Sequence, residues 1–134
     1  EKPTSLFMTE TDYSNQFGKG FNGEAGVLEL RTYTAREGKL SALNNRFQSH
    51  TTTLFEKHGM ANLAYWTAFD APENKTTLIY MLQHKNREQA NVNWKAFLSD
   101  PDWKQVSAES TSNGKLLAKP PERLYLRPLD ISVP

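Results

Sequence analysis

His50 is the residue whose type and position most favour chemistry in this sequence. It is one of three histidines, and it falls between Phe47 and Leu54 on a stripe of apolar residues with helical spacing. We therefore expect its imidazole to face the interior, where it could serve as a general base or as the axial ligand of a haem. A histidine that is hydrogen-bonded to an internal acceptor, with only a structural role, is the commoner alternative.

The other two histidines do not extend this site to a metal centre. His58 falls in the last turn of the same predicted helix, where an imidazolium would complement the helix dipole. The spacing of His50, His58 and His84 fits no zinc or di-iron motif, and the chain contains no cysteine. No metal and no cofactor is therefore predicted, and haem stays as the one cofactor alternative.

A second candidate site is polar and aromatic. Charged and phenolic residues alternate along two predicted strands: Glu29, Arg31 and Tyr33 in one, and Arg123, Tyr125 and Arg127 in the other. Together with two aromatic residues of the middle strands, they predict a cavity lined by Arg31, Tyr33, Trp66, Tyr80 and Arg127. Arginine in an aromatic-walled cavity suits a small apolar or anionic ligand. In the alternative, Glu29 pairs with one of the arginines across strands and only fills the interior.

The composition excludes several other function classes. Sixteen Lys and Arg face 15 Asp and Glu, and a formal net charge of +1 predicts no nucleic-acid partner. No apolar run approaches the length of about 18 residues that predicts a membrane span. The sequence also lacks a Gly-rich phosphate loop and a serine-nucleophile elbow. We expect a soluble protein of undetermined compartment, exported or otherwise processed, or a trimmed sequence, because the chain begins at Glu1 rather than Met.

The elements that must position these residues follow from the hydrophobic periodicity. The pattern predicts strands and helices in the order strand 27–33, helix 40–58, strands 62–69 and 76–84, helices 87–98 and 101–110, and strand 123–127. Gly59 ends the first helix, and Asp100 caps the last one. The large aromatic residues of the helices, Phe47, Trp94, Phe97 and Trp103, are expected in the core. The order β-α-β-β-α-β is that of an α+β, ferredoxin-like domain, with a four-stranded antiparallel sheet and both helical segments on one face.

Such a sheet leaves one apolar face uncovered, since the middle strands are apolar on both sides. The same face of a second copy is the simplest cover, so we predict a homodimer. If the helices cover Leu28 and Leu30, then Glu29, Arg31 and Tyr33 point into the space between the two copies. The facing of Trp66 and Tyr80 depends on one residue of register.

The first 26 residues differ from the rest of the chain. They hold four of the seven glycines and are rich in Thr, Ser, Asn and Gln. This composition predicts a flexible polar arm over residues 1–26 that can lie across a neighbouring surface, followed by a folded domain over residues 27–134.

The motifs of the folded part resemble the NIPSNAP family over residues 27–132. The resemblance is carried by short motifs in family-like order: Glu29–Tyr33 with Gly38–Leu40, Leu54–Gly59 with Trp66, Trp94–Phe97, Asp100–Trp103 and Arg123–Pro128. It implies the dimeric α+β barrel superfamily. The function it implies is a small-molecule-binding or protein-interaction module without an established reaction, the latter engaging a partner through residues 1–26. The alternative is a cofactor-independent monooxygenase-like or haem-handling enzyme, with His50 as base or ligand and Arg31 and Tyr33 positioning the substrate; whether the protein is an enzyme stays open.

Overall fold

The computed structural model describes residues 7–14, 17, 26–69 and 77–127. Its strands are β1 (Phe7–Glu10), β2 (Val27–Thr34), β3 (Ala61–Phe69), β4 (Thr77–His84) and β5 (Glu122–Leu126). Its helices are α1 (Leu40–Arg46), the π-helical turn η2 (Phe47–Thr51), α2 (Thr52–Lys57), α3 (Arg87–Ser99) and α4 (Pro101–Ser110). The α+β fold with four antiparallel strands, β2 to β5, is confirmed. No predicted strand or helix end differs from the observed one by more than one residue.

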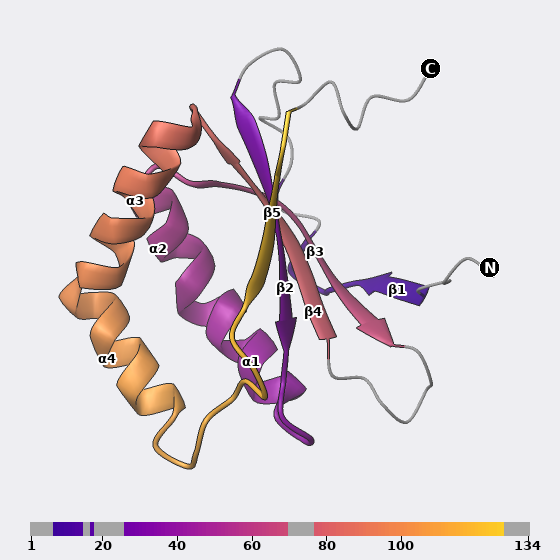
Figure 1. Cartoon of the computed structure of the whole chain (residues 1–134). Coiled ribbons are helices and arrows are strands. Elements are labelled where there is room, and N and C mark those ends of the chain that lie inside the picture. Colours follow the sequence, from indigo (N-terminus) through magenta and orange to yellow (C-terminus); the bar gives the residue numbers. More distant parts are fainter. Residues whose placement is uncertain (1–6, 15–16, 18–25, 70–76, 128–134) are drawn as a thin grey trace.

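All strands form one antiparallel sheet in the order β1-β3-β4-β2-β5. The helices lie together on one side of this sheet, with α3 and α4 in the outer position (Figure 1). Large side chains of η2, α2 and α3 pack against the sheet. The core between the two layers contains Phe47, Phe55, Tyr65, Tyr80 and Phe97. This layer between helices and sheet is the part of the fold that forms the site described below.

Strand β1 is the element that the sequence did not predict. It pairs antiparallel with β3, from Phe7 opposite Phe69 to Glu10 opposite Trp66. Tyr13 follows it into the core with 4% of its surface exposed, and its hydroxyl donates to Asn44 Oδ1 at 2.7 Å. The described part of the predicted arm therefore packs on the domain and contributes a fifth strand. Residues 1–6, 15–16 and 18–25 of the arm lie outside the described residues.

The pairing register settles which residues share a face of the sheet. Arg31 stands opposite Tyr80 of β4 and opposite Arg123 of β5. Because side chains alternate along a strand, Glu29, Arg31 and Tyr33 lie on one face, and Leu28 and Leu30 lie on the other. Trp94 of α3 contacts the first group, so the helices cover the polar face. The helices do not cover Leu28 and Leu30, so the condition under which these three residues would point between two copies is not met.

The helix that begins at Leu40 contains a π-turn, which changes its inward face. The backbone N–H of Thr52 donates to the carbonyl of Phe47, five residues earlier rather than four. A π-turn inserts one extra residue into the helical repeat, so the inward position passes to the next residues along the chain. Thr51 and Thr52 are buried, and His50 is exposed. The prediction that His50 faces the interior is therefore wrong.

Candidate functional site

A cavity of about 400 Å³ lies between the polar face of the sheet and the helices. Its walls come from β2, α1, η2, α2, α3, α4 and the segment that leads into β5. Aromatic side chains form much of the lining: Tyr33, Phe47, Phe55, Trp94, Phe97 and Trp103. Four cationic residues also line it, namely Arg31, Arg46, Lys115 and Arg123. No acidic residue is among the described residues that line this cavity.

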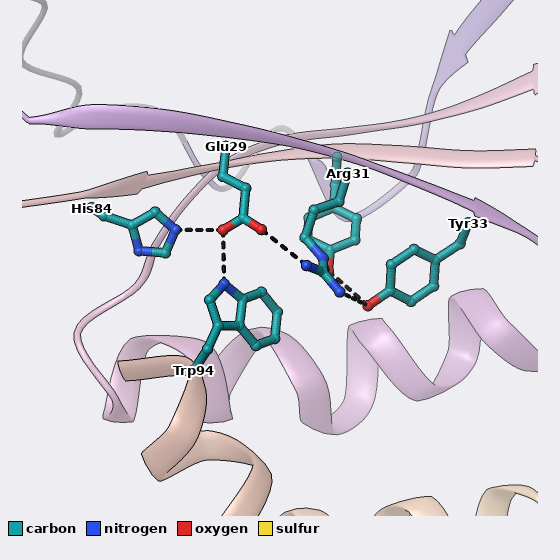
Figure 2. A network of polar contacts seen from close by, with 6 residues as sticks. Glu29, Arg31, Tyr33, His84 and Trp94 are labelled. Carbon is teal, nitrogen blue, oxygen red and sulfur yellow. Dashed lines mark hydrogen bonds and ion pairs between the residues drawn. The ribbon is translucent and has the colours of Figure 1, made fainter. Parts of the chain in front are cut away.

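Glu29 connects the side chains behind the inner wall of the cavity through its hydrogen bonds. It is completely buried, and its Oε1 accepts hydrogen bonds from His84 Nε2 at 2.6 Å and from Trp94 Nε1 at 2.7 Å. Its Oε2 accepts from Arg31 Nη1 at 2.9 Å. Figure 2 shows the carboxylate between the two rings on one side and the guanidinium on the other. One buried carboxylate thus fixes side chains from β4, α3 and β2.

Arg31, fixed by Glu29, in turn orients the phenol groups of Tyr80 and Tyr33. Its Nε donates to Tyr80 Oη at 2.9 Å and its Nη2 to Tyr33 Oη at 3.1 Å, while its guanidinium lies 4.1 Å from the centre of the Trp94 ring. Tyr80 Oη and Tyr33 Oη are 3.0 Å apart. Tyr80 is completely buried, and Tyr33 is the phenol that lines the cavity. The hydrogen-bond network that begins at Glu29 therefore ends at Tyr33.

Of the two hydroxyl protons of Tyr80 and Tyr33, one is not used in the hydrogen bond between them. Each phenol oxygen accepts a hydrogen bond from Arg31, and Tyr80 donates its own proton to Tyr33 Oη. Tyr33 Oη then accepts from both Tyr80 and Arg31, and its own hydroxyl proton is left to be donated. Because Tyr33 lines the cavity, this proton is available to an acceptor bound there.

The charges of Glu29 and Arg31 are stabilised by each other. Burial raises the pKa of Glu29, but the hydrogen bonds from His84, Trp94 and Arg31 outweigh it and hold that pKa below the ordinary value. Burial lowers the pKa of Arg31, but the phenols of Tyr80 and Tyr33, together with Glu29, raise it above its ordinary value. Both groups are therefore ionised at neutral pH.

Arg46 lies in the same cavity without such a partner. Its side chain comes from the end of α1, stacks 5.0 Å from the centre of the Trp103 ring, and is 8% exposed. Nη1 donates to Ser110 Oγ at 3.2 Å, and Nε is buried without a hydrogen-bond partner. Burial lowers the pKa of Arg46, against the opposing effect of Tyr33 and Tyr80. Within the described ranges, no carboxylate forms an ion pair with this guanidinium.

The residues predicted to line a cavity separate into three groups. Arg31 and Tyr33 line it, and Tyr80 supports both from behind. Trp66 stands opposite Ile79, one residue out of step with the Tyr65–Tyr80 pair, and so lies on the other face of the sheet. Arg127 is exposed beyond the end of β5 and is not in the lining. Trp66 and Arg127 therefore leave the candidate site.

Neither His50 nor His58 lines the cavity. His50 borders shallow clefts between η2 and α4, next to Val106 and Glu109. His58 Nε2 lies 2.7 Å from Asp100 Oδ2, in a surface cluster where Asp100 also caps α4 and meets Lys57. His58 thus ties the end of α2 to the start of α4, which differs from the dipole role expected of it.

Arg46 and the two helix tryptophans are the site residues that the sequence did not single out. Trp94 and Trp103 were expected only as core, and both line the cavity. The available signal was Arg46 itself, since a cation stands between Leu43 and Phe47 on the apolar stripe of the first helix. A charge at such a position is rare unless it has a partner.

A family model described as NIPSNAP matches residues 28–132. The chain belongs to the NIPSNAP family. An uncharacterised NIPSNAP-like protein from Burkholderia xenovorans has a similar structure, with 17% identity, a TM-score of 0.65, and coverage of 81% of this chain and 89% of the other. A NIPSNAP protein of unknown function from Agrobacterium tumefaciens shares 14% identity at a TM-score of 0.63, covering 83% and 92%.

A more distant likeness is to a monooxygenase from the gene ActVA-Orf6 of Streptomyces coelicolor, solved with nanaomycin D. It shares 15% identity at a TM-score of 0.54, and coverage is 84% of this chain and 96% of the other. At such identities these NIPSNAP structures and the monooxygenase show a common fold. No match to a curated protein was found. The family brings no established reaction with it, so the function must be argued from the cavity.

The described residues do not fit the haem alternative. Its axial ligand was to be His50, which lies outside the cavity, and no histidine is among the described residues that line it. Nor do those residues include a cluster of three or more His, Cys, Asp or Glu able to hold a metal ion. In the described part of the chain, no helix is both long and apolar enough to cross a bilayer.

Proposed function

We propose that this NIPSNAP protein binds a small molecule with an apolar body in the cavity between its sheet and its helices. The observation that carries the proposal is the cavity itself, with about 400 Å³, aromatic walls and four cationic residues. Ligand sites in proteins have volumes of roughly 300–1,000 Å³ and combine apolar walls with a few polar groups. Trp94 and Trp103 offer flat surfaces, and Tyr33 offers a hydroxyl proton.

The chemistry of the lining supports binding rather than catalysis. A general base must be able to take up a proton near neutral pH. Guanidinium groups do not release theirs, and the one carboxylate of the network, Glu29, lies behind Arg31 and is completely buried. The monooxygenase-like alternative therefore finds no histidine or carboxylate base among the described lining residues.

Chemical-shift mapping with two isosteric probes, 2-naphthamide and 2-naphthoate, tests the proposal. We expect at least one of them to shift the indole N–H resonance of Trp103 and backbone amides of β2 and α4. The indole of Trp66, on the other face, is the internal control and stays unchanged. Ser107→Phe, which fills the cavity from α4, abolishes the shifts, and Ser112→Phe at an exposed position does not. Shifts confined to Trp66 and its neighbours, or no binding of either probe, would contradict the proposal.

The assembly that fits this fold is a homodimer through the opposite face of the sheet. That face carries Leu30, Ile79 and Met81 in the centre and Trp66 and Leu124 to either side. Leu124 is 55% exposed, and Leu30, Met81 and Trp66 are partly exposed. An exposed apolar face of this kind is uncommon on a monomer, and the same face of a second copy would bury it. The ligand cavity would then remain separate in each subunit, since it lies on the helix side.

A further inference from the structure

The two arginines of the cavity differ in how their charge is balanced. Arg31 makes an ion pair of 2.9 Å with Glu29 and donates to two phenols. Its positive charge is therefore neutralised within the protein, and its orientation is fixed before any ligand enters. An anion that approached Arg31 would also approach the carboxylate of Glu29, which lies directly behind it. Arg31 is thus a poor counter-ion for a ligand.

Arg46 has the opposite character. It is more than nine-tenths buried, its Nε has no acceptor among the described residues, and its Nη1 donates to the neutral hydroxyl of Ser110. Glu109 of α4 borders a surface cleft together with Arg46, but it is exposed, accepts from Gln105, and forms no ion pair with Arg46. A buried cation without a counter-ion is costly, and such groups are ordinarily paired. Within the described part of the chain, the protein does not supply that counter-ion.

We infer that the ligand of this cavity is an organic anion, a carboxylate on an aromatic or alicyclic body, and that Arg46 is the residue that pairs with its charge. The inference rests on the proposed function and specifies its ligand class. The guanidinium carbon of Arg46 lies over the Trp103 ring, 5.0 Å from its centre, and guanidinium groups placed over aromatic rings can still bind a carboxylate through their N–H groups. The body of the ligand packs against Trp94 and Phe97, which adjoin Trp103 in the same wall.

The other polar groups of the wall agree with this orientation. Thr111 Oγ1 donates to the carbonyl of Ser107, so its proton is not available to a ligand. Ser110, the acceptor of Arg46, donates to the same carbonyl from outside the lining. Lys115 lines the same cavity and adds a second positive charge. At the inner wall the hydroxyl of Tyr33 is a donor made stronger by the two hydrogen bonds that it accepts. A carboxylate at Arg46 and a donor at Tyr33 together define the polar contacts of the ligand.

The affinities of 2-naphthoate and 2-naphthamide, measured by calorimetry, test the inference, because the two differ in charge and hardly in shape. We expect the wild-type protein to bind the carboxylate roughly tenfold or more tightly than the amide. Arg46→Gln removes this preference and leaves the affinity for the amide unchanged. Arg46→Lys, which keeps the charge, retains part of the preference. Arg36→Gln removes a charge from an exposed position outside the cavity and serves as the matched control.

A second readout separates this role from a purely structural one. If Arg46 is an unpaired buried cation, Arg46→Gln leaves the Tm of the ligand-free protein unchanged or raises it, and it reduces the rise in Tm that 2-naphthoate causes. If Arg46 serves mainly to link α1 to α4, the same variant lowers the ligand-free Tm.

Three outcomes would overturn the inference. The first is equal wild-type affinity for the two probes, which leaves the proposed function intact. The second is a preference for the carboxylate that survives in Arg46→Gln or is lost in Arg46→Lys as completely as in Arg46→Gln. The third is binding of neither probe in the cavity, and only this outcome also overturns the proposed function.

Discussion

At the residue scale, Glu29 is the side chain on which most of the inner wall depends. Its two oxygens accept from Trp94, His84 and Arg31, which belong to three different elements. A buried carboxylate is stable only when all of its hydrogen bonds are made. Losing the charge leaves Arg31 buried without a counter-ion, and removing one partner of a buried ion pair typically costs about 3–5 kcal/mol.

We therefore predict that Glu29→Gln lowers the free energy of unfolding at pH 7 by about 3 kcal/mol or more, as measured by urea denaturation. It also changes the pH dependence. The pKa of Glu29 is lowered in the folded protein, so the unfolded chain binds more protons below the ordinary glutamate pKa of about 4.3. The stabilisation is complete above that pH and is lost as the pH falls.

The wild-type protein should accordingly lose stability more steeply than Glu29→Gln between pH 5 and pH 3, in repeated urea titrations. Asp100 also has a lowered pKa, caused by hydrogen bonds from Lys57 and His58, and adds an acid loss of the same sign. Both proteins retain Asp100, so the difference between them reports on Glu29. Parallel pH profiles would show that the Glu29 network does not stabilise the fold.

At the element scale, the turns decide how closely the helices approach the sheet. Gly59 follows the end of α2 with φ +79°, a backbone region that residues with a Cβ adopt at a cost. A Cβ at this position would lie 2.9 Å from Asn93 Nδ2 of α3. The close contact between this turn and α3 thus requires glycine for two separate reasons.

We predict that Gly59→Ala lowers the free energy of unfolding more than Gly38→Ala does. Gly38 has the same φ of +79°, and nothing lies within 4 Å of where its Cβ would be. Gly38→Ala should cost about 1 kcal/mol from backbone strain alone, and Gly59→Ala about 2 kcal/mol or more. Chemical denaturation of both variants checks this. Equal losses would mean that Asn93 moves aside without cost.

Hydrophobic periodicity was sufficient to predict the order of the elements and the sharing of Arg31 and Tyr33 by one face. It could not show which face the helices cover, because both faces of β4 are apolar and the deciding contact comes from Trp94, distant in sequence. The position of His50 was missed for another reason. A π-turn has no reliable sequence signal, and one inserted residue is enough to move a side chain off the inward face.

At the scale of the whole molecule, our proposals assign separate roles to the two faces of the sheet. The polar face and the helices enclose the cavity, and the apolar face around Met81 is open to a second copy. Strand β1 extends the sheet beyond β3 and covers the edge that β3 would otherwise present. No alternating pattern marks β1 in the sequence, because the strand is short and takes its stability from pairing with β3.

We predict that the protein migrates at about twice its 15.3 kDa chain mass in size-exclusion chromatography at micromolar concentration. Met81→Asp places a charge in the centre of the apolar face and should yield the monomer. Val92→Asp is the matched control, because Val92 is a 58% exposed apolar residue of α3, in the helix layer. A wild-type monomer, or a dimer unaffected by Met81→Asp, would contradict the proposed interface.

The strand order also sets when, during folding, the cavity comes into existence. Its first wall is β2, near the start of the domain, and its last parts are α4 and the segment that ends at Arg123 of β5, which pairs with β2 only after all the elements between them have been made. Contacts between such distant parts of a chain form late. A ligand that needs both walls cannot guide the early steps of folding. We expect the proposed ligand to act on the folded protein, by slowing the rate at which the helices and β5 separate from β2.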